Sequence, residues 1–284
     1  MFLAMMIYGE PGCEILYPNP GFPIYESTIR FSGAKPIPIP LREQNGFSFS
    51  AEEVLSKINE RTRLIILNSP ANPTGGVVPR GEFNALIEGL CKWPDVAIMS
   101  DEIYGQMLYD NREHVSLVRY PEINDRLILL DGWSKTYAMT GWRLGYSVWP
   151  EKVAPHAEKL CVNIHSCVNS SAQFAGIAAL TGDQSPVKAM VSAFDERRTV
   201  IVNELNKIRG FSCIQPGGAF YAFPNITQTG FRSDELQKKI LEDAGVAVIS
   251  GTSFGEHGEG YLRFSYANST ENILKAVDLI KGCL

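Results

Sequence analysis

Three polar clusters in the sequence each begin where an apolar run ends. The first contains Asn72, the second contains Asp101 with Tyr104 three residues later, and the third contains Lys135. In open α/β sheets, ligands bind outside the carboxyl ends of the strands. We therefore expect the clusters to meet in one crevice, where an amide, a carboxylate, a phenol and an amine surround one small molecule.

Each of these residues also has a structural explanation. The segment Asn72–Gly75 is a good turn, because proline fixes φ and glycine adopts positive φ. Asp101 could cap a helix, and Tyr104 could be a core aromatic residue. Taken alone, Lys135 is typical of a protein surface. Arg143, eight residues further on, could form a structural ion pair. The structural explanations together account poorly for all four features in this order, each after an apolar run.

The apolar runs are the elements that must position these side chains. The clearest are residues 64–67, 96–99 and 127–130, each apolar on both faces as a helix-covered strand must be. Helical patterns separate them, which indicates βαβ units and a parallel sheet. Ser50 with Glu53 predicts a capping box at the start of one of these helices.

The pattern changes after about residue 181. Pro186 follows Ser185 at the start of a long helix with an apolar stripe. Shorter strands follow at 220–223, 246–249 and 261–266, and two further helices follow around 234–244 and 270–281. We therefore predict an α/β fold, with a three-layer, mostly parallel sheet in a large domain (1–182) and a smaller C-terminal α+β domain (183–284).

Composition excludes several classes of function. The chain has 284 residues, 45% hydrophobic residues and a net charge of −5, which is typical of a globular protein and argues against a general nucleic-acid binder. No apolar run reaches the ~20 residues that a membrane-spanning helix needs, and the first residues do not resemble a signal peptide. The six cysteines include no C-x-x-C pair. We expect a cytoplasmic protein without metal.

Five segments together resemble the pyridoxal-phosphate (PLP)-dependent aminotransferases of class I/II, fold type I. They are Asn72–Gly75, Asp101–Tyr104, Ser134–Gly145, Gly217–Tyr221 and Tyr261–Ala267. The third, Ser-Lys-Thr-Tyr-Ala-Met-Thr-Gly-Trp-Arg-Leu-Gly, is the most specific. The resemblance covers essentially the whole chain.

The resemblance implies roles for the residues of the three clusters. Lys135 would bind PLP as the Schiff-base lysine, and its released amine would move the proton between the substrate α-carbon and the C4′ atom of the cofactor. A free lysine has a pKa of about 10.4, so this role needs an environment that shifts it. Asp101 would keep the pyridine nitrogen protonated, so that the ring withdraws electrons. Tyr104 and Asn72 would hydrogen-bond the 3′-oxygen of the cofactor.

Four further residues acquire roles from the same resemblance. Arg143 would hold the cofactor phosphate, with Ser134 as an accessory contact, because a guanidinium suits bidentate phosphate binding. Phe22 would stack on the pyridine ring, although a core phenylalanine is nearly as good an explanation. Arg263 would bind the substrate α-carboxylate, together with Asn72.

The sequence departs from the family at the phosphate site. Relatives place a Gly-rich or Ser/Thr-containing turn at a helix N-terminus, where backbone N–H groups bind phosphate. No such turn occurs here, and residues 1–7 resemble the end of the helix that would follow it. Gly132 also stands where many relatives have a phosphate-binding serine. We expect that the chain starts inside an element whose first part is missing.

Three functions follow for comparison. The first is transamination between an L-amino acid and a 2-oxo acid by a homodimer, with aspartate- or glutamate-type substrates favoured. The second is a PLP-dependent carbon–sulfur β-lyase of the same fold. The third is a catalytically inactive fragment that lacks the phosphate-binding turn. A Rossmann dehydrogenase is disfavoured, because no G-x-G-x-x-G opens a helix after a strand.

Overall fold

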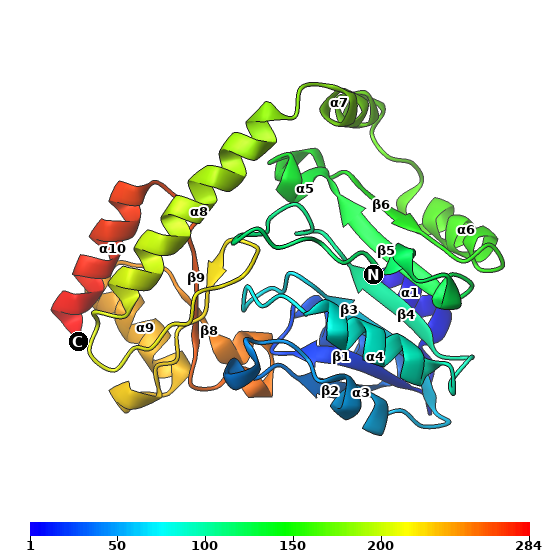
Figure 1. Cartoon of the computed structure of the whole chain (residues 1–284), viewed down its shortest axis with the longest axis horizontal. Helices are drawn as coiled ribbons and strands as arrows, with labels where there is room; N and C mark the ends of the chain where they lie inside the picture. The colour runs from blue at the N-terminus through cyan, green and yellow to red at the C-terminus, as the bar shows by residue number, and fades with distance from the viewer.

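The computed structural model describes residues 1–284 and contains a six-stranded sheet, a three-stranded sheet and the helices that pack on them (Figure 1). The large sheet has the order β2-β1-β3-β4-β5-β6. Strands β1 to β5 are parallel, and β6 pairs antiparallel with β5. Their bounds are β1 Glu14–Asn19, β2 Lys35–Pro40, β3 Thr62–Asn68, β4 Ala97–Asp101, β5 Leu127–Gly132 and β6 Gly145–Val148. The predicted mostly parallel sheet is confirmed.

Helices cover both faces of this sheet. They include α1 Phe2–Tyr8, α2 Ile24–Ser32, α3 Ala51–Ser56 and α4 Arg80–Leu90. Successive strand residues point to opposite faces. On β3, Leu64 and Ile66 therefore pack in a cluster with α1 and α2, whereas Ile65 and Leu67 pack in a cluster with α3 and α4. Burial on both faces explains why the central strands are continuous apolar runs.

The helix α3 begins with half of the predicted capping box. The Ser50 side chain accepts a hydrogen bond from the Glu53 backbone nitrogen at 3.4 Å. The Glu53 carboxylate does not return to the Ser50 backbone, because it forms a bidentate pair with the Arg42 guanidinium instead. The prediction of a reciprocal box is therefore wrong, whereas the predicted start of the helix is confirmed.

The segment of residues 133–205, which follows β5, is helical for most of its length. It contains α5 Trp133–Thr136, α6 Ala154–His165, α7 Ser170–Thr181 and the long α8 Ser185–Leu205. Helix α6 packs against α1. In Figure 1, α8 runs from beside α7 towards the second sheet. The 3-10 helices of the chain are η1 Glu43–Asn45, η2 Leu117–Arg119, η3 Pro121–Ile123, η4 Thr140–Trp142, η5 Thr227–Thr229, η6 Gly251–Phe254 and η7 Glu256–Gly258.

The second sheet is antiparallel and small. Its order is β7-β9-β8, with bounds β7 Tyr221–Ala222, β8 Ile249–Ser250 and β9 Leu262–Ser265. Helices α9 Ser233–Ala244 and α10 Thr270–Cys283 lie close to their predicted positions. The strands are shorter than the apolar runs that predicted them, because apolar residues also occur outside the paired segments of a buried chain.

A core of 23 buried residues joins this second sheet to α8, α9 and α10. Three residues of the segment after β4, Tyr104, Met107 and Tyr109, belong to the same core. The division of the chain into domains at residue 182 stays a prediction. The structure has no helix with both the length and the apolar character that crossing a membrane requires.

Candidate active site

The carboxyl ends of β3, β4 and β5 meet at one cavity of about 530 Å³. Asn68, the last residue of β3, donates a hydrogen bond from Nδ2 to the backbone oxygen of Asp101 at 2.9 Å. Its Oδ1 accepts a hydrogen bond from the Asn72 backbone nitrogen at 3.0 Å. Asn68 thus fixes the first polar cluster against the second. Lys135 follows β5 on α5 and lines the same cavity.

Asp101 is a buried carboxylate, with 7% of the residue exposed. Its Oδ2 accepts a hydrogen bond from the Tyr25 hydroxyl at 2.6 Å, and its Oδ1 accepts one from the Ile103 backbone nitrogen at 3.3 Å. Burial raises the pKa of Asp101, and these two hydrogen bonds oppose that rise. Burial also raises the pKa of Tyr25, so its phenol stays protonated and donates.

The Lys135 amine lies beside aromatic rings. Its Nζ is 5.8 Å from the ring centroid of Tyr104 and 5.3 Å from that of Phe220. Burial lowers the pKa of Lys135, and the positive charges of Arg263 and Arg143 lower it further. The environment that a reactive lysine needs is therefore present at this position.

Tyr104 is buried just beyond the carboxyl end of β4. Its hydroxyl is 2.9 Å from the hydroxyl of Tyr221 on β7, and either can donate. Burial raises the pKa of Tyr104, so the phenol carries its proton at neutral pH. This contact connects the large sheet to the small one at the cavity.

Arg263 reaches the cavity from β9. Its Nη1 donates a hydrogen bond to Asn72 Oδ1 at 3.0 Å. Its Cζ lies 4.6 Å from the ring centroid of Tyr221 and 4.8 Å from that of Phe254. Its Nε is buried without a hydrogen-bond partner. Burial lowers the pKa of Arg263, as expected for a desolvated cation that lacks a counter-ion. An anion bound at this position would satisfy both the charge and the free donor.

Ser134, Arg143 and Phe22 also line the cavity. Arg143 is exposed, and its Nη1 donates to the Thr140 backbone oxygen at 2.7 Å. Phe22 makes an edge-to-face contact with Tyr25, with ring centroids 5.8 Å apart. The structure thus brings every site residue that the sequence predicts to one place.

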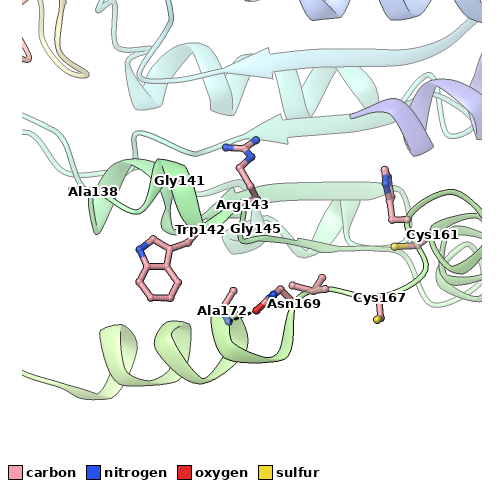
Figure 2. A pocket seen from close by; sticks show the side chains of 11 residues that line it. Ala138, Gly141, Trp142, Arg143, Gly145, Cys161, Cys167, Asn169 and Ala172 are labelled. Carbon is pink, nitrogen blue, oxygen red and sulfur yellow. Dashed lines mark hydrogen bonds between the residues drawn. The ribbon is translucent and has the colours of Figure 1, made fainter.

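A second, wider cavity of about 930 Å³ adjoins the first and shares Arg143 and Gly145 with it. Figure 2 shows it between the loop that carries Trp142 and the start of α7, with the side chains of Trp142 and Arg143 pointing in different directions. Neither Lys135 nor Asp101 lines this cavity. Of the predicted site residues, only Arg143 lines both cavities, and all the others line the smaller one alone.

Several cavity residues were not predicted from the sequence, among them Tyr25 and Tyr221. Tyr25 contacts Asp101 across 76 residues of sequence, and Tyr221 contacts Tyr104 across 117. Tyr221 lies in a segment that carries the family resemblance, which was the only signal for it. Tyr25 lies three residues after Phe22 and reads as the apolar face of a helix.

Comparison with known proteins decides the family. A family profile described as "Aminotransferase class I and II" matches residues 1–280. The chain belongs to this family. It is 39% identical over 285 residues to an aspartate aminotransferase of Pyrococcus horikoshii, an alignment that covers 100% of the chain and 72% of that relative.

Solved structures of aminotransferases share the fold. An aromatic aminotransferase from Pyrococcus horikoshii superposes with a TM-score of 0.95 at 32% identity, covering 99% of this chain and 75% of that one. The aspartate aminotransferase from Rhizobium meliloti superposes with a TM-score of 0.94 at 33% identity, covering 99% and 73%. The fold is therefore that of the fold type I aminotransferases.

Class I and II aminotransferases are PLP-dependent enzymes, and the cavity of this aminotransferase fits the cofactor. A buried carboxylate, Asp101, suits a protonated pyridine nitrogen, which would compensate its desolvation. The amine of Lys135 has the lowered pKa that reaction with an aldehyde needs. The unpartnered Nε of Arg263 is suited to a carboxylate.

Proposed function

We propose that this aminotransferase catalyses transamination between an L-amino acid and a 2-oxo acid, with Lys135 as the lysine that binds PLP covalently. The observation that carries the proposal is the Lys135 amine in one cavity with the buried carboxylate of Asp101 and the desolvated guanidinium of Arg263. Asp101 complements the positive charge of a pyridinium ring, Arg263 complements the negative charge of an α-carboxylate, and Lys135 supplies an amine that can react with an aldehyde.

Within this proposal, each side chain has a defined task. PLP, when bound, supplies an electron-withdrawing pyridinium ring that stabilises negative charge at the substrate α-carbon. Asp101 holds the proton on the pyridine nitrogen, and Tyr25 keeps the Asp101 carboxylate oriented. Lys135, as a neutral amine, would take the proton from the substrate α-carbon and deliver it to the C4′ carbon of the cofactor, as transamination requires. Arg263 binds the α-carboxylate with Asn72 beside it, which fixes the α-carbon near the base.

The remaining residues would hold the cofactor. Tyr104 and Asn72, which line the cavity, would hydrogen-bond the 3′-oxygen, with the Tyr104 phenol as a donor. Arg143 and Ser134, which line the cavity, would bind the phosphate, and the ring of Phe22 would pack against the pyridine face. Lys135, Asp101 and Tyr104 are the residues we assign to catalysis.

The proposed substrate class is taken from the names of the relatives. Two relatives, 39% and 34% identical to the chain, are named for aspartate and for aromatic amino acids, respectively. We propose a dicarboxylic amino donor of the aspartate or glutamate type. No observation in the structure favours a carbon–sulfur lyase over transamination.

We further propose a cytoplasmic homodimer with the domain division at residue 182. The surface of α7 supports the homodimer, because Phe174, Ile177 and Leu180 expose more than half of their surface on a helix without a charged residue. Exposed apolar patches of this kind are typical of protein interfaces.

The test is a direct assay of amino-group transfer. The chain is supplied with PLP, L-aspartate and 2-oxoglutarate, and glutamate formation is measured by chromatography. The Lys135→Ala variant is expected to lose turnover entirely, whereas the exposed-lysine control Lys152→Ala retains it. Glutamate formation by Lys135→Ala at the rate of the parent chain would contradict the proposal.

A further inference from the structure

Tyr221 occupies an unusual position at the active site. It belongs to β7 of the small sheet, yet its side chain lines the cavity that holds Lys135 and Asp101. Only 5% of the residue is exposed. Its two ends contact two different side chains of the site, Tyr104 at the hydroxyl and Arg263 at the ring face.

The hydroxyl of Tyr221 bears on which of the two tyrosines donates the hydrogen bond between them. The hydroxyls of Tyr221 and Tyr104 are 2.9 Å apart, and each phenol has a single proton to donate. If Tyr104 donates its proton to a ligand, only Tyr221 can donate in the contact between the two. Tyr221 then acts as a donor to Tyr104 oxygen, which strengthens the hydrogen bond that Tyr104 makes to the ligand.

The ring end supports a cation. The guanidinium carbon of Arg263 lies 4.6 Å from the ring centroid of Tyr221, and Phe254 packs at 4.8 Å. Strands β7 and β9 are paired, with Tyr221 opposite Ser265, so the backbone holds the ring beside Arg263. Planar guanidinium groups stack favourably on aromatic faces, and more strongly when they are desolvated.

We propose that Tyr221 is a positioning residue that orients the cofactor-facing proton of Tyr104 and the carboxylate-binding guanidinium of Arg263 at the same time. The hydroxyl performs the first task and the ring performs the second. The inference rests on the proposed function, because it takes PLP and a substrate carboxylate as the ligands. The two ligand sites are thus linked through one side chain of the small sheet.

Two variants separate the two tasks. Tyr221→Phe removes the hydroxyl and keeps the ring, whereas Tyr221→Leu removes both. Tyr266→Phe is the matched control, because Tyr266 is a buried tyrosine of the same core that donates to a backbone oxygen, Ala219 O, at 3.1 Å. Circular dichroism and thermal melting of each variant show whether it is folded.

The first readout is spectroscopic. The visible absorbance of the PLP-loaded chain is followed against pH. Loss of the Tyr221 hydroxyl weakens the Tyr104 hydrogen bond to the ionised 3′-oxygen, so the midpoint of the absorbance change rises by about half a pH unit in Tyr221→Phe. In Tyr266→Phe it stays where it is in the parent chain. An unchanged midpoint in Tyr221→Phe would overturn the proposal.

The second readout is binding of maleate, a dicarboxylate that cannot transfer an amino group, measured by calorimetry with and without PLP. The Kd is expected to stay within about twofold in Tyr221→Phe and to rise about five- to tenfold in Tyr221→Leu. If Tyr221→Leu does not fold, Tyr221→Met fills a similar volume without a ring and is measured in the same way. A Kd equal to that of the parent chain in the folded ring-free variant would overturn the proposal.

The design also separates this inference from the proposed function. A parent chain that binds no PLP would overturn the proposed function and the hydroxyl task with it. The maleate titration without PLP would still decide the ring task. A parent chain that binds PLP and transfers amino groups, combined with an unshifted midpoint in Tyr221→Phe, would leave the proposed function intact and reject the role of Tyr221.

Discussion

At the scale of single residues, burial acts on opposite charges in one cavity. It raises the pKa of Asp101 and lowers the pKa values of Lys135 and Arg263, so burial disfavours the charged form of each group. Ligands of complementary charge would reverse this penalty when they bind. A pyridinium nitrogen and an α-carboxylate are such ligands, which is the physical basis for placing them beside Asp101 and Arg263.

The carboxylate of Asp101 is expected to act mainly in the transition state. Asp101→Asn keeps the shape but removes the charge that stabilises the protonated pyridine nitrogen. We expect kcat to fall on the order of a hundredfold or more, with a smaller change in KM. Steady-state transamination kinetics measure both. The control is Asp125→Asn, because Asp125 is exposed and precedes the amino end of β5, whereas the cavity lies at the carboxyl ends of the strands. A change in KM alone would refute the role of Asp101.

The lowered pKa of Lys135 predicts the direction of a shift in a labelling experiment. Only the neutral amine is acylated, so a lower pKa means a larger reactive fraction at neutral pH. The rate of acetylation of Lys135, followed by peptide mass spectrometry against pH, is expected to reach half its maximum below the ordinary lysine value of about 10.4. Arg143→Gln removes a positive charge that lowers this pKa, and should raise the midpoint. A midpoint at or above 10.4 in the parent chain would contradict this.

At the scale of elements, the parallel strands determine where the chemistry lies. Residues buried on both faces make β3, β4 and β5 readable from the sequence, and their shared direction places Asn72, Asp101 and Lys135 together. The exposed β6 had no such signal. The contacts of Tyr25 and Tyr221 were also hidden, because hydrogen bonds between residues 76 and 117 positions apart depend on packing rather than on local pattern.

The cap of α3 gives a test at this scale. Ser50→Ala removes the acceptor for the Glu53 backbone nitrogen and should lower the free energy of unfolding by about 1 kcal/mol. Glu53→Gln, which weakens the surface pair with Arg42, should cost less. Urea denaturation measures both variants. A larger loss in Glu53→Gln than in Ser50→Ala would show that the pair between Arg42 and Glu53 stabilises the start of α3 more than the Ser50 cap does.

At the scale of the whole molecule, the site is completed by the small sheet. Asn72 and Arg263 are 191 residues apart in sequence and are joined by one hydrogen bond, so the substrate carboxylate would bind where the two sheets meet. The family resemblance indicated Arg263, but its place between two aromatic rings could not be predicted from the sequence, because the rings come from β7 and η6.

Replacement of Arg263 should affect binding across this junction. Arg263→Lys keeps the charge but loses the planar, bidentate and stacked geometry. We expect the KM for the amino acid to rise about tenfold or more, with a smaller effect on PLP affinity. Arg209→Lys on the surface serves as the control. An unchanged KM would remove Arg263 from the substrate site.

The most direct test of the account is to identify the residue that PLP labels. The purified chain is incubated with PLP, its visible spectrum is recorded, the adduct is reduced with borohydride, and the labelled peptide is mapped by mass spectrometry. The account predicts a single major label on Lys135 that is lost in Lys135→Ala. A chain that takes up no label, or one labelled mainly at other lysines, would contradict it.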